Sequence, residues 1–154
     1  MIRITGTADL LLRASKIGGV ISVGPDDTVL TALEVMATHN IGAVAVLDAG
    51  GSLAGILSER DYARKVELRG GTARATKVSE IMTAEVVTVT PATSVADCNA
   101  LMHRHRVRHL PVVEQGRVVG VLSSRDVLDE VVAEEAKQIQ QLETERLLID
   151  TGNY

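Results

Sequence analysis

The sequence predicts an α/β (α+β) fold made of two similar units that pack through their sheets, with a helix added at the C-terminus. Residues 22–61 align with residues 88–126, and self-similarity at one fixed spacing marks a repeated structural unit. Within each copy, short β-branched runs alternate with apolar residues at helical spacing, which indicates a strand–helix–strand–strand–helix order. Residues 134–154 continue past the repeat with a helical pattern of their own.

Each unit is expected to begin with a strand. This strand is "GVISV", before Pro25, in the first unit and "EVVTVT", before Pro91, in the second. Apolar residues at helical spacing come next, and they predict one helix per unit. These residues are Val29, Leu33 and Met36 in the first copy and Val95, Cys98 and Met102 in the second. Asp26 or Asp27, and Thr93 or Ser94, stand where the helix N-caps belong.

Two hairpins are expected after these helices. "GAVAVLD" and "LAGILS" flank Gly50 and Gly51, whereas "HLPVVE" and "VVGVLS" flank Gln115 and Gly116. The spacing between matching residues falls from 66 at Pro25 and Pro91 to 65 at Gly55 and Gly120, because the first turn is one residue longer. We predict two domains, at residues 8–69 and 78–133, joined by a polar linker at 70–77.

The segment 134–154 is predicted to be a C-terminal helical extension. Val132, Ile139, Leu142 and Ile149 alternate spacings of seven and three, which gives one narrow apolar face. This face could pack on its own domain or form a subunit contact. We favour the subunit contact, because the final helix of the second unit is expected to end near Ala133.

Composition excludes several classes of function. A net charge of −4 argues against a nucleic-acid partner, and no apolar run approaches the roughly 20 residues that a membrane span needs. With one cysteine, Cys98, the chain has no internal disulfide, and without a signal-peptide pattern we expect it in the cytoplasm. Tyr62 and Tyr154 are the only aromatic residues, so aliphatic side chains must hold any bound base.

The phrase Gly-x-x-Ser-x-Arg-Asp occurs twice, ending at Asp61 and at Asp126, where a strand is expected to run into a helix. One interpretation is a capping box, in which Ser58 with Asp61, and Ser123 with Asp126, satisfy the free amides of the helix start. Capping requires neither the Arg nor the Gly. A helix N-terminus with an Arg suits a phosphate, and a carboxylate can accept both ribose hydroxyls. The two interpretations can coexist.

These motifs, together with "TVTP" and "RHLPVV", resemble tandem cystathionine-β-synthase (CBS) domains over about residues 8–133. The resemblance implies a pseudo-symmetric pair with a ligand cleft on each side of the sheet interface. It also implies adenosine-containing ligands, such as AMP, ADP, ATP, NAD or S-adenosylmethionine, that regulate a partner protein. No catalytic cofactor is implied.

By the same resemblance, the ribose-binding aspartates fall on Asp61 and Asp126. The remaining expected ligand residues are Ser58, Ser123, Arg60 and Arg125 at the helix starts, Thr88 and Ser22 at the base, and Ile41, Gly42, Val107, Arg108 and His109 at the strand openings. The first unit lacks the basic residues that the second has at the strand opening. We therefore expect unequal clefts, with phosphorylated adenosine bound more tightly beside Asp126.

His103, His105 and His109 lie close together in the sequence, and imidazoles suit zinc. No carboxylate or thiolate nearby in the sequence completes a ligand set, so we favour a basic rim for phosphate and predict no metal site. We also predict no enzyme activity, because a duplicated polar motif suits two binding clefts better than one reaction site. The expected protein is a homodimeric regulatory module with an unknown regulated partner. The alternative is a dimerisation scaffold with vestigial clefts.

Overall fold

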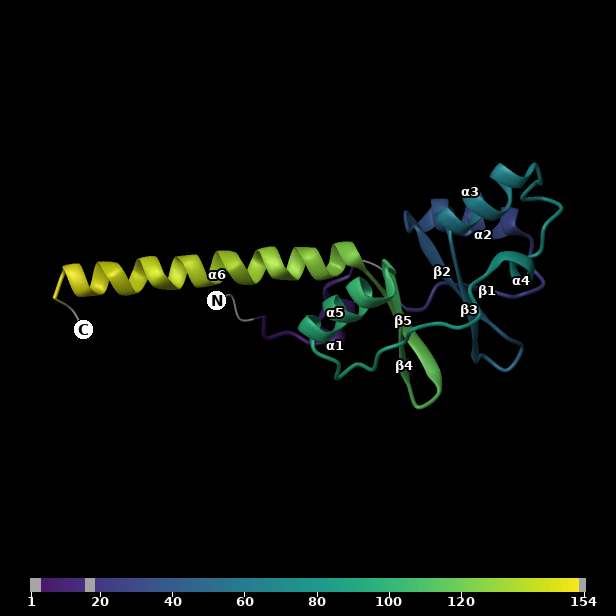
Figure 1. The fold of residues 1–154 in the computed structure, drawn as a ribbon. Coiled ribbons are helices and arrows are strands. Elements are labelled where there is room, and N and C mark those ends of the chain that lie inside the picture. Colours follow the sequence, from purple (N-terminus) through teal and green to yellow (C-terminus); the bar gives the residue numbers. More distant parts are fainter. Residues whose placement is uncertain (1–3, 16–18, 153–154) are drawn as a thin grey trace.

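The computed structural model describes residues 4–15 and 19–152. Figure 1 shows two lobes side by side, with one long helix projecting away from the second lobe. The elements in chain order are α1 (Ala8–Ala14), β1 (Ser22–Val23), α2 (Val29–His39), β2 (Ala43–Leu47), β3 (Leu53–Ser58), α3 (Glu59–Lys65), η1 (Glu67–Arg69), α4 (Val78–Ile81), α5 (Val95–His105), β4 (His109–Glu114), β5 (Arg117–Ser123) and α6 (Ser124–Asp150).

The two sheets confirm the predicted α/β repeat and both hairpins. In the first, β1 runs parallel to β2, which pairs antiparallel with β3; in the second, β4 pairs antiparallel with β5. The strand expected at 85–90 is reduced to one parallel bridge between Val89 and Val112. Part of this segment lies along a cleft instead, as described below. The second turn has positive φ at both Gln115 and Gly116, which suits a two-residue hairpin.

The N-caps of the two central helices are Thr28 and Ser94, whose hydroxyls accept the amides of Thr31 and Asp97 at 3.1 and 3.0 Å. The alternative of Ser94 is thus confirmed, whereas the prediction of Asp26 or Asp27 is wrong. Asp27 instead accepts the amide of Gly24 and closes the turn that precedes the helix.

The two hydrophobic cores do not follow chain order. The first core combines α2, β2 and β3 with Val78 and Ile81 of α4, although α4 follows the linker. The second core combines α5, β4 and β5 with Ala8 and Leu11 of α1, from the other end of the chain. Short helices are thus exchanged between the units, and two equivalent β-bridges accompany this exchange. Thr28 pairs with Lys77, and Thr7 pairs with Ser94. Each unit therefore completes its core with a short helix that precedes the other unit.

The glycine of the repeated phrase lies where these exchanged segments cross the sheet. A Cβ on Gly55 would lie 2.7 Å from the carbonyl oxygen of Thr83, and one on Gly120 would lie 2.6 Å from Cδ2 of Leu12. At Gly55 the close approach lets the backbones of Ile56 and Thr83 exchange two hydrogen bonds of 3.0 and 2.9 Å. Glycine at position 55 is therefore explained by a close backbone approach, and glycine at position 120 by a close side chain.

The last helix differs from the prediction, because α6 runs without a break from Ser124 to Asp150 instead of ending near Ala133. No glycine or proline occurs within it, and its Ala, Glu, Gln, Lys and Leu residues are good helix formers. Val127 is buried and Val131 packs on the second core, while the rest of the helix extends outward (Figure 1). In the part of the chain that the structure describes, no helix is both long and apolar enough to cross a membrane.

Candidate ligand-binding clefts

Two clefts, of about 400 and 470 Å³, lie between the two units. Gly42, Ala43, Arg108 and His109 line both of them, so the openings of β2 and β4 form a common wall. Both volumes fall within the range of small-molecule pockets, about 300–1,000 Å³. The expectation of one cleft on each side of the sheet interface therefore has a direct structural counterpart.

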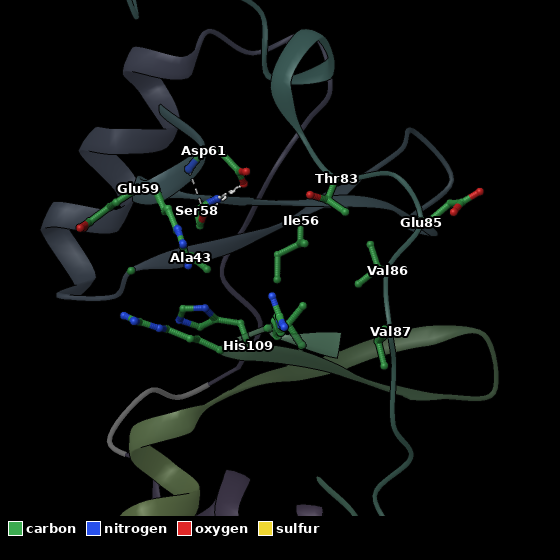
Figure 2. Close-up of a pocket in the computed structure, with 15 residues that line it drawn as sticks. Ala43, Ile56, Ser58, Glu59, Asp61, Thr83, Glu85, Val86, Val87 and His109 are labelled. Carbon is green, nitrogen blue, oxygen red and sulfur yellow. Dashed lines mark hydrogen bonds between the residues drawn. The ribbon is translucent and has the colours of Figure 1, made fainter. Parts of the chain in front are cut away.

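The first cleft is shown in Figure 2. Ser58 and Asp61 line it at the start of α3, and Ile56 lines it from β3. Arg60 of α3 also belongs to the lining. Facing them are residues of the second unit, with Val86 and Val87 along one wall and His109 at the opening of β4. Val107 and Arg108, which precede β4, complete this part of the lining.

The second cleft repeats this arrangement with the units interchanged. Ser123, Arg125 and Asp126 come from the start of α6, while Ile21, Ile41 and Gly42 come from the first unit. Each cleft thus joins the helix start of one unit to the strand opening of the other. This crossing corrects the expectation that Arg108 and His109 would distinguish the Asp126 cleft, since both residues line the Asp61 cleft as well.

Both capping boxes form. The Oδ2 atom of Asp61 accepts the amide and the hydroxyl of Ser58 at 2.9 and 3.0 Å, and the amide of Asp61 donates to that hydroxyl at 3.1 Å. The same three bonds in the second copy measure 2.7, 3.0 and 3.2 Å, between Ser123 and Asp126. The capping interpretation of the motif is therefore confirmed for both copies.

The second carboxylate oxygen distinguishes the two copies. Lys65 reaches Oδ1 of Asp61 at 3.2 Å and also donates to the carbonyl oxygen of Ile81 at 2.9 Å. Among the described residues, none forms a hydrogen bond or an ion pair with Oδ1 of Asp126, which leaves an acceptor at the second cleft. One motif thus presents two different receptors.

The charged side chains of the lining also distinguish the two clefts. Three arginines line the first cleft, Arg60, Arg106 and Arg108, but so do three carboxylates, Glu59, Asp61 and Glu85. The charged side chains lining the second are Arg108, Arg125 and Asp126. The described lining of the Asp126 cleft therefore carries the more positive net charge, for a reason that the sequence pattern did not identify.

His109 stands on the common wall of both clefts. Burial lowers the pKa of its imidazole, Asp126 acts in the opposite direction, and Arg108 lowers it further. The imidazole is thus held neutral near pH 7, with one ring nitrogen able to accept a hydrogen bond.

Aliphatic side chains supply the apolar walls, as expected from the scarcity of aromatic residues. They are Ile56, Val86, Val87 and Val107 in the first cleft and Leu12, Ile21, Ile41, Val119 and Val121 in the second. Ser22 and Thr88 are exposed and lie outside both linings, where their neighbours Ile21 and Val87 contribute instead. A contact from Ser22 or Thr88 to a base stays a prediction.

The expected ligand set left out several polar residues that line the clefts, among them Asn40 in the second and Arg106 in the first. Both end a central helix in the left-handed conformation, with φ of 52° and 53°. They match at the repeat spacing of 66, so the alignment contained a signal for them. Within the described residues, no group of three or more His, Cys, Asp or Glu side chains could hold a metal ion.

Comparisons with known proteins agree with this architecture. The sequence profile described as CBS domain matches residues 15–68 and 78–133. The mitochondrial CBS domain-containing protein CBSX3 of Arabidopsis thaliana is 43% identical over 121 residues, covering 76% of this chain and 59% of that protein. The chain therefore spans less than two thirds of that relative's length.

Two solved structures are similar over most of the chain. One, described as a signal-transduction protein with CBS domains from Burkholderia ambifaria MC40-6, has a TM-score of 0.77 and 43% identity, covering 82% of this chain and 94% of that one. The other is the CBS domain protein PAE2072 from Pyrobaculum aerophilum complexed with AMP. Its TM-score is 0.70 at 25% identity, covering 82% of this chain and 98% of that one.

Proposed function

The chain belongs to the CBS domain family, and from this membership we propose that it is a regulatory module whose clefts bind adenosine-containing nucleotides. AMP, ADP, ATP, NAD and S-adenosylmethionine are the candidate ligands. The observation that carries the proposal is the Asp126 cleft, where a capped helix start and two arginines meet aliphatic walls, and where Oδ1 of Asp126 has no partner among the described residues. The AMP bound to the PAE2072 protein supports the same ligand class.

Each part of such a ligand has a complementary group in this cleft. The base packs between aliphatic side chains such as Ile21 and Val121, which require only an apolar face. The ribose hydroxyls donate to Oδ1 of Asp126, so that Oδ2 can keep its capping bonds to Ser123. The phosphate meets Arg108, Arg125 and the amides of the α6 start.

In this proposal the Asp126 cleft binds the ligand more tightly than the Asp61 cleft does. In the first cleft a ribose must compete with Lys65 for Oδ1 of Asp61, and a phosphate meets the additional carboxylates Glu59 and Glu85. The first effect weakens the contact to the ribose, and the second acts against an anionic phosphate. Calorimetry on Asp61→Ala and Asp126→Ala distinguishes the sites, and loss of tight binding in the Asp61 variant alone would reverse the assignment.

The module acts on another protein and not as an enzyme, and it works as a homodimer. Oligomers of this size are most often closed by two-fold symmetry. A location in the cytoplasm remains part of the prediction. The regulated partner would respond to a change at the clefts or in the assembly.

A specific observation favours the alternative of a dimerisation scaffold. The capping boxes by themselves account for the Ser and Asp of both motifs, so these residues need not bind anything. Capping gives no reason for the apolar walls of the clefts or for the arginines at both helix starts. The scaffold hypothesis is therefore the second candidate.

The test is a set of thermal melts with and without AMP, ADP, ATP, NAD and S-adenosylmethionine, on the wild type and on Asp126→Ala. A ligand that binds only the folded state raises its stability by an amount that depends on affinity. We expect Asp126→Ala to weaken binding about ten- to a hundredfold, corresponding to about 1.5–3 kcal/mol for bonds to a charged group.

Glu80→Ala is the matched control. Glu80 is also the third residue of its helix and accepts a backbone amide, from Lys77 at 2.6 Å, but it lines neither cleft. Both variants should lose about 0.5–2 kcal/mol of folding stability. Only Asp126→Ala should lose the ligand-induced shift, and an undiminished shift in that variant would favour the scaffold.

A further inference from the structure

The outer part of α6 presents an exposed seam, which we define as Val132, Glu135, Ile139, Leu142, Arg146 and Ile149. These residues alternate spacings of three and four, the pattern of a coiled-coil contact face. The four apolar members are 57, 52, 65 and 65% exposed. Figure 1 shows this part of the helix standing clear of both lobes.

The protein's own cores leave the seam uncovered. Val127 is the one buried residue of α6, and Val131 is the last to pack on the second core. A helix with this much exposed apolar surface gains most of its stability from packing, not from intrinsic propensity. The described part of the chain offers no packing partner for residues 132–150.

We propose that the seam binds the seam of a second copy of this chain in antiparallel orientation, with Ile139 of one copy beside Leu142 of the other. In an antiparallel pair with this alignment, the numbers of any two residues that face one another add up to 281. Val132 then faces Ile149 of the second copy, and the central Ile139–Leu142 pair occurs twice around the two-fold axis.

Charge complementarity selects this orientation. The two polar seam residues, Glu135 and Arg146, also add up to 281, so each Glu135 faces Arg146 of the second copy. A parallel pair would instead place Glu135 against Glu135 and Arg146 against Arg146, which is unfavourable in a partly desolvated seam. Moving the antiparallel pair by one heptad would place Ile139 opposite Glu135 in one direction and Leu142 opposite Arg146 in the other.

The length of the free helix agrees with the same alignment. Residue 150 of the second copy reaches Val131, where the first copy's helix begins to pack on its core. The two helices therefore overlap along the whole uncovered segment, and the ligand clefts lie at opposite ends of the dimer. Between residues 134 and 150 five carboxylates outnumber Lys137 and Arg146, which argues against an anionic membrane or nucleic acid as the occupant.

This inference rests on the proposed homodimer and specifies its geometry. The first experiment measures the dimer dissociation constant by sedimentation for the wild type, Glu135→Arg, Arg146→Glu and the double exchange. Each single variant should weaken the dimer about tenfold or more, because two symmetry-related pairs become repulsive at once. The double exchange should restore it, and Lys137→Glu, off the seam, should leave it unchanged.

The second experiment tests orientation with cysteines. An equimolar mixture of Val132→Cys and Ile149→Cys should form a disulfide between copies, whereas Val132→Cys alone should not. In the antiparallel pair the two copies of residue 132 are separated by about 25 Å along the axis, at 1.5 Å per residue. Cys98 is buried and does not compete.

The outcomes separate this inference from the proposal it rests on. A wild type that stays monomeric at all concentrations overturns both the homodimer and its geometry. A stable dimer whose dissociation constant does not change with the charge reversals overturns only the proposed seam contact. A disulfide between two copies of Val132→Cys does the same. Helix content measured by circular dichroism confirms that each variant still folds.

Discussion

Asp61 and Asp126 occupy the same position of the same motif, yet they offer different groups to a ligand. The residue four positions later is Lys65 in the first copy and Glu130 in the second. On a helix, this spacing places the two side chains on one face, so Lys65 can occupy the remaining oxygen of Asp61 at 3.2 Å. One substitution between the repeats thus makes otherwise matching receptors unequal.

Replacement of Lys65 by Met should therefore strengthen binding at the first cleft. The change frees Oδ1 of Asp61, and a partly exposed pair of this kind is worth about 1 kcal/mol, which corresponds to about fivefold in affinity. Adenosine is the probe for calorimetry, because it has no charge that the lost ammonium could affect at a distance. Lys77→Met, at the exposed pair with Asp26, is the control. Weaker adenosine binding in Lys65→Met would contradict the competition argument.

The partly buried imidazole of His109 should make stability depend on pH. Because burial lowers its pKa in the folded state, the unfolded chain binds the proton more readily below about pH 6.5. Its contribution is complete above that pH and is lost as the pH falls through the folded-state pKa. Denaturant melts from about pH 7.5 to 5.5 should show a smaller loss in His109→Gln than in the wild type. The exposed His105→Gln should match the wild type, and equal losses in all three proteins would count against the prediction.

At the scale of single elements, the exchanged segments account for the glycine of the repeated phrase. Gly55 of β3 lies under Met82 and Thr83, and Gly120 of β5 lies under Leu12 of α1. The first contact is with backbone and holds Thr83 against Ile56, at the start of the segment that lines the first cleft. The second is with the end of a side chain. Equivalent glycines therefore tolerate substitution differently.

Gly55→Ala should destabilise the protein more than Gly120→Ala. A methyl group 2.7 Å from a carbonyl oxygen must displace backbone, for which overpacking costs of about 1–3 kcal/mol are typical, whereas Leu12 can change rotamer. Denaturant midpoints compare the two variants directly. Combining Gly120→Ala with Leu12→Ala removes the second clash and serves as its control. Wild-type stability in Gly55→Ala would show that this crossing is not tight.

For the molecule as a whole, the exchange of α1 and α4 makes the two cores depend on each other's chain segments. Leu11 of α1 belongs to the second core and is 3% exposed, although the sequence places it within residues 8–69, the first predicted domain. Damage at the N-terminus should therefore appear in the distant half of the chain.

Leu11→Ala should cost about 2–5 kcal/mol and reduce amide protection in α5, β4 and β5 before it does so in β2 and β3. The neighbouring Leu10, 44% exposed, provides the control, since Leu10→Ala should change stability by no more than about 0.5 kcal/mol. Hydrogen exchange distinguishes the regions. Loss of protection confined to the first unit would mean that α1 does not support the second core.

The sequence by itself determined the repeated α/β architecture, both hairpins and both capping boxes. These features depend on local order, because the strand period, the helical spacing and the Ser-x-x-Asp contact all lie within a few residues of the chain. The same reasoning identified Ser58, Asp61, Ser123 and Asp126 as residues at helix starts, and the structure places all four at the clefts.

Only the tertiary structure decided which unit completes which core and which cleft. The exchange of α1 and α4 depends on how distant segments pack, and so does the position of Arg108 and His109 at both clefts. Packing also brings Lys65 of α3, beside Asp61, to the carbonyl oxygen of Ile81 in α4. The physical reason is that the burial of apolar surface stabilises the fold whatever the position of that surface in the chain. A repeat therefore specifies two equivalent units, while the crossing of segments between them gives each cleft its own chemistry.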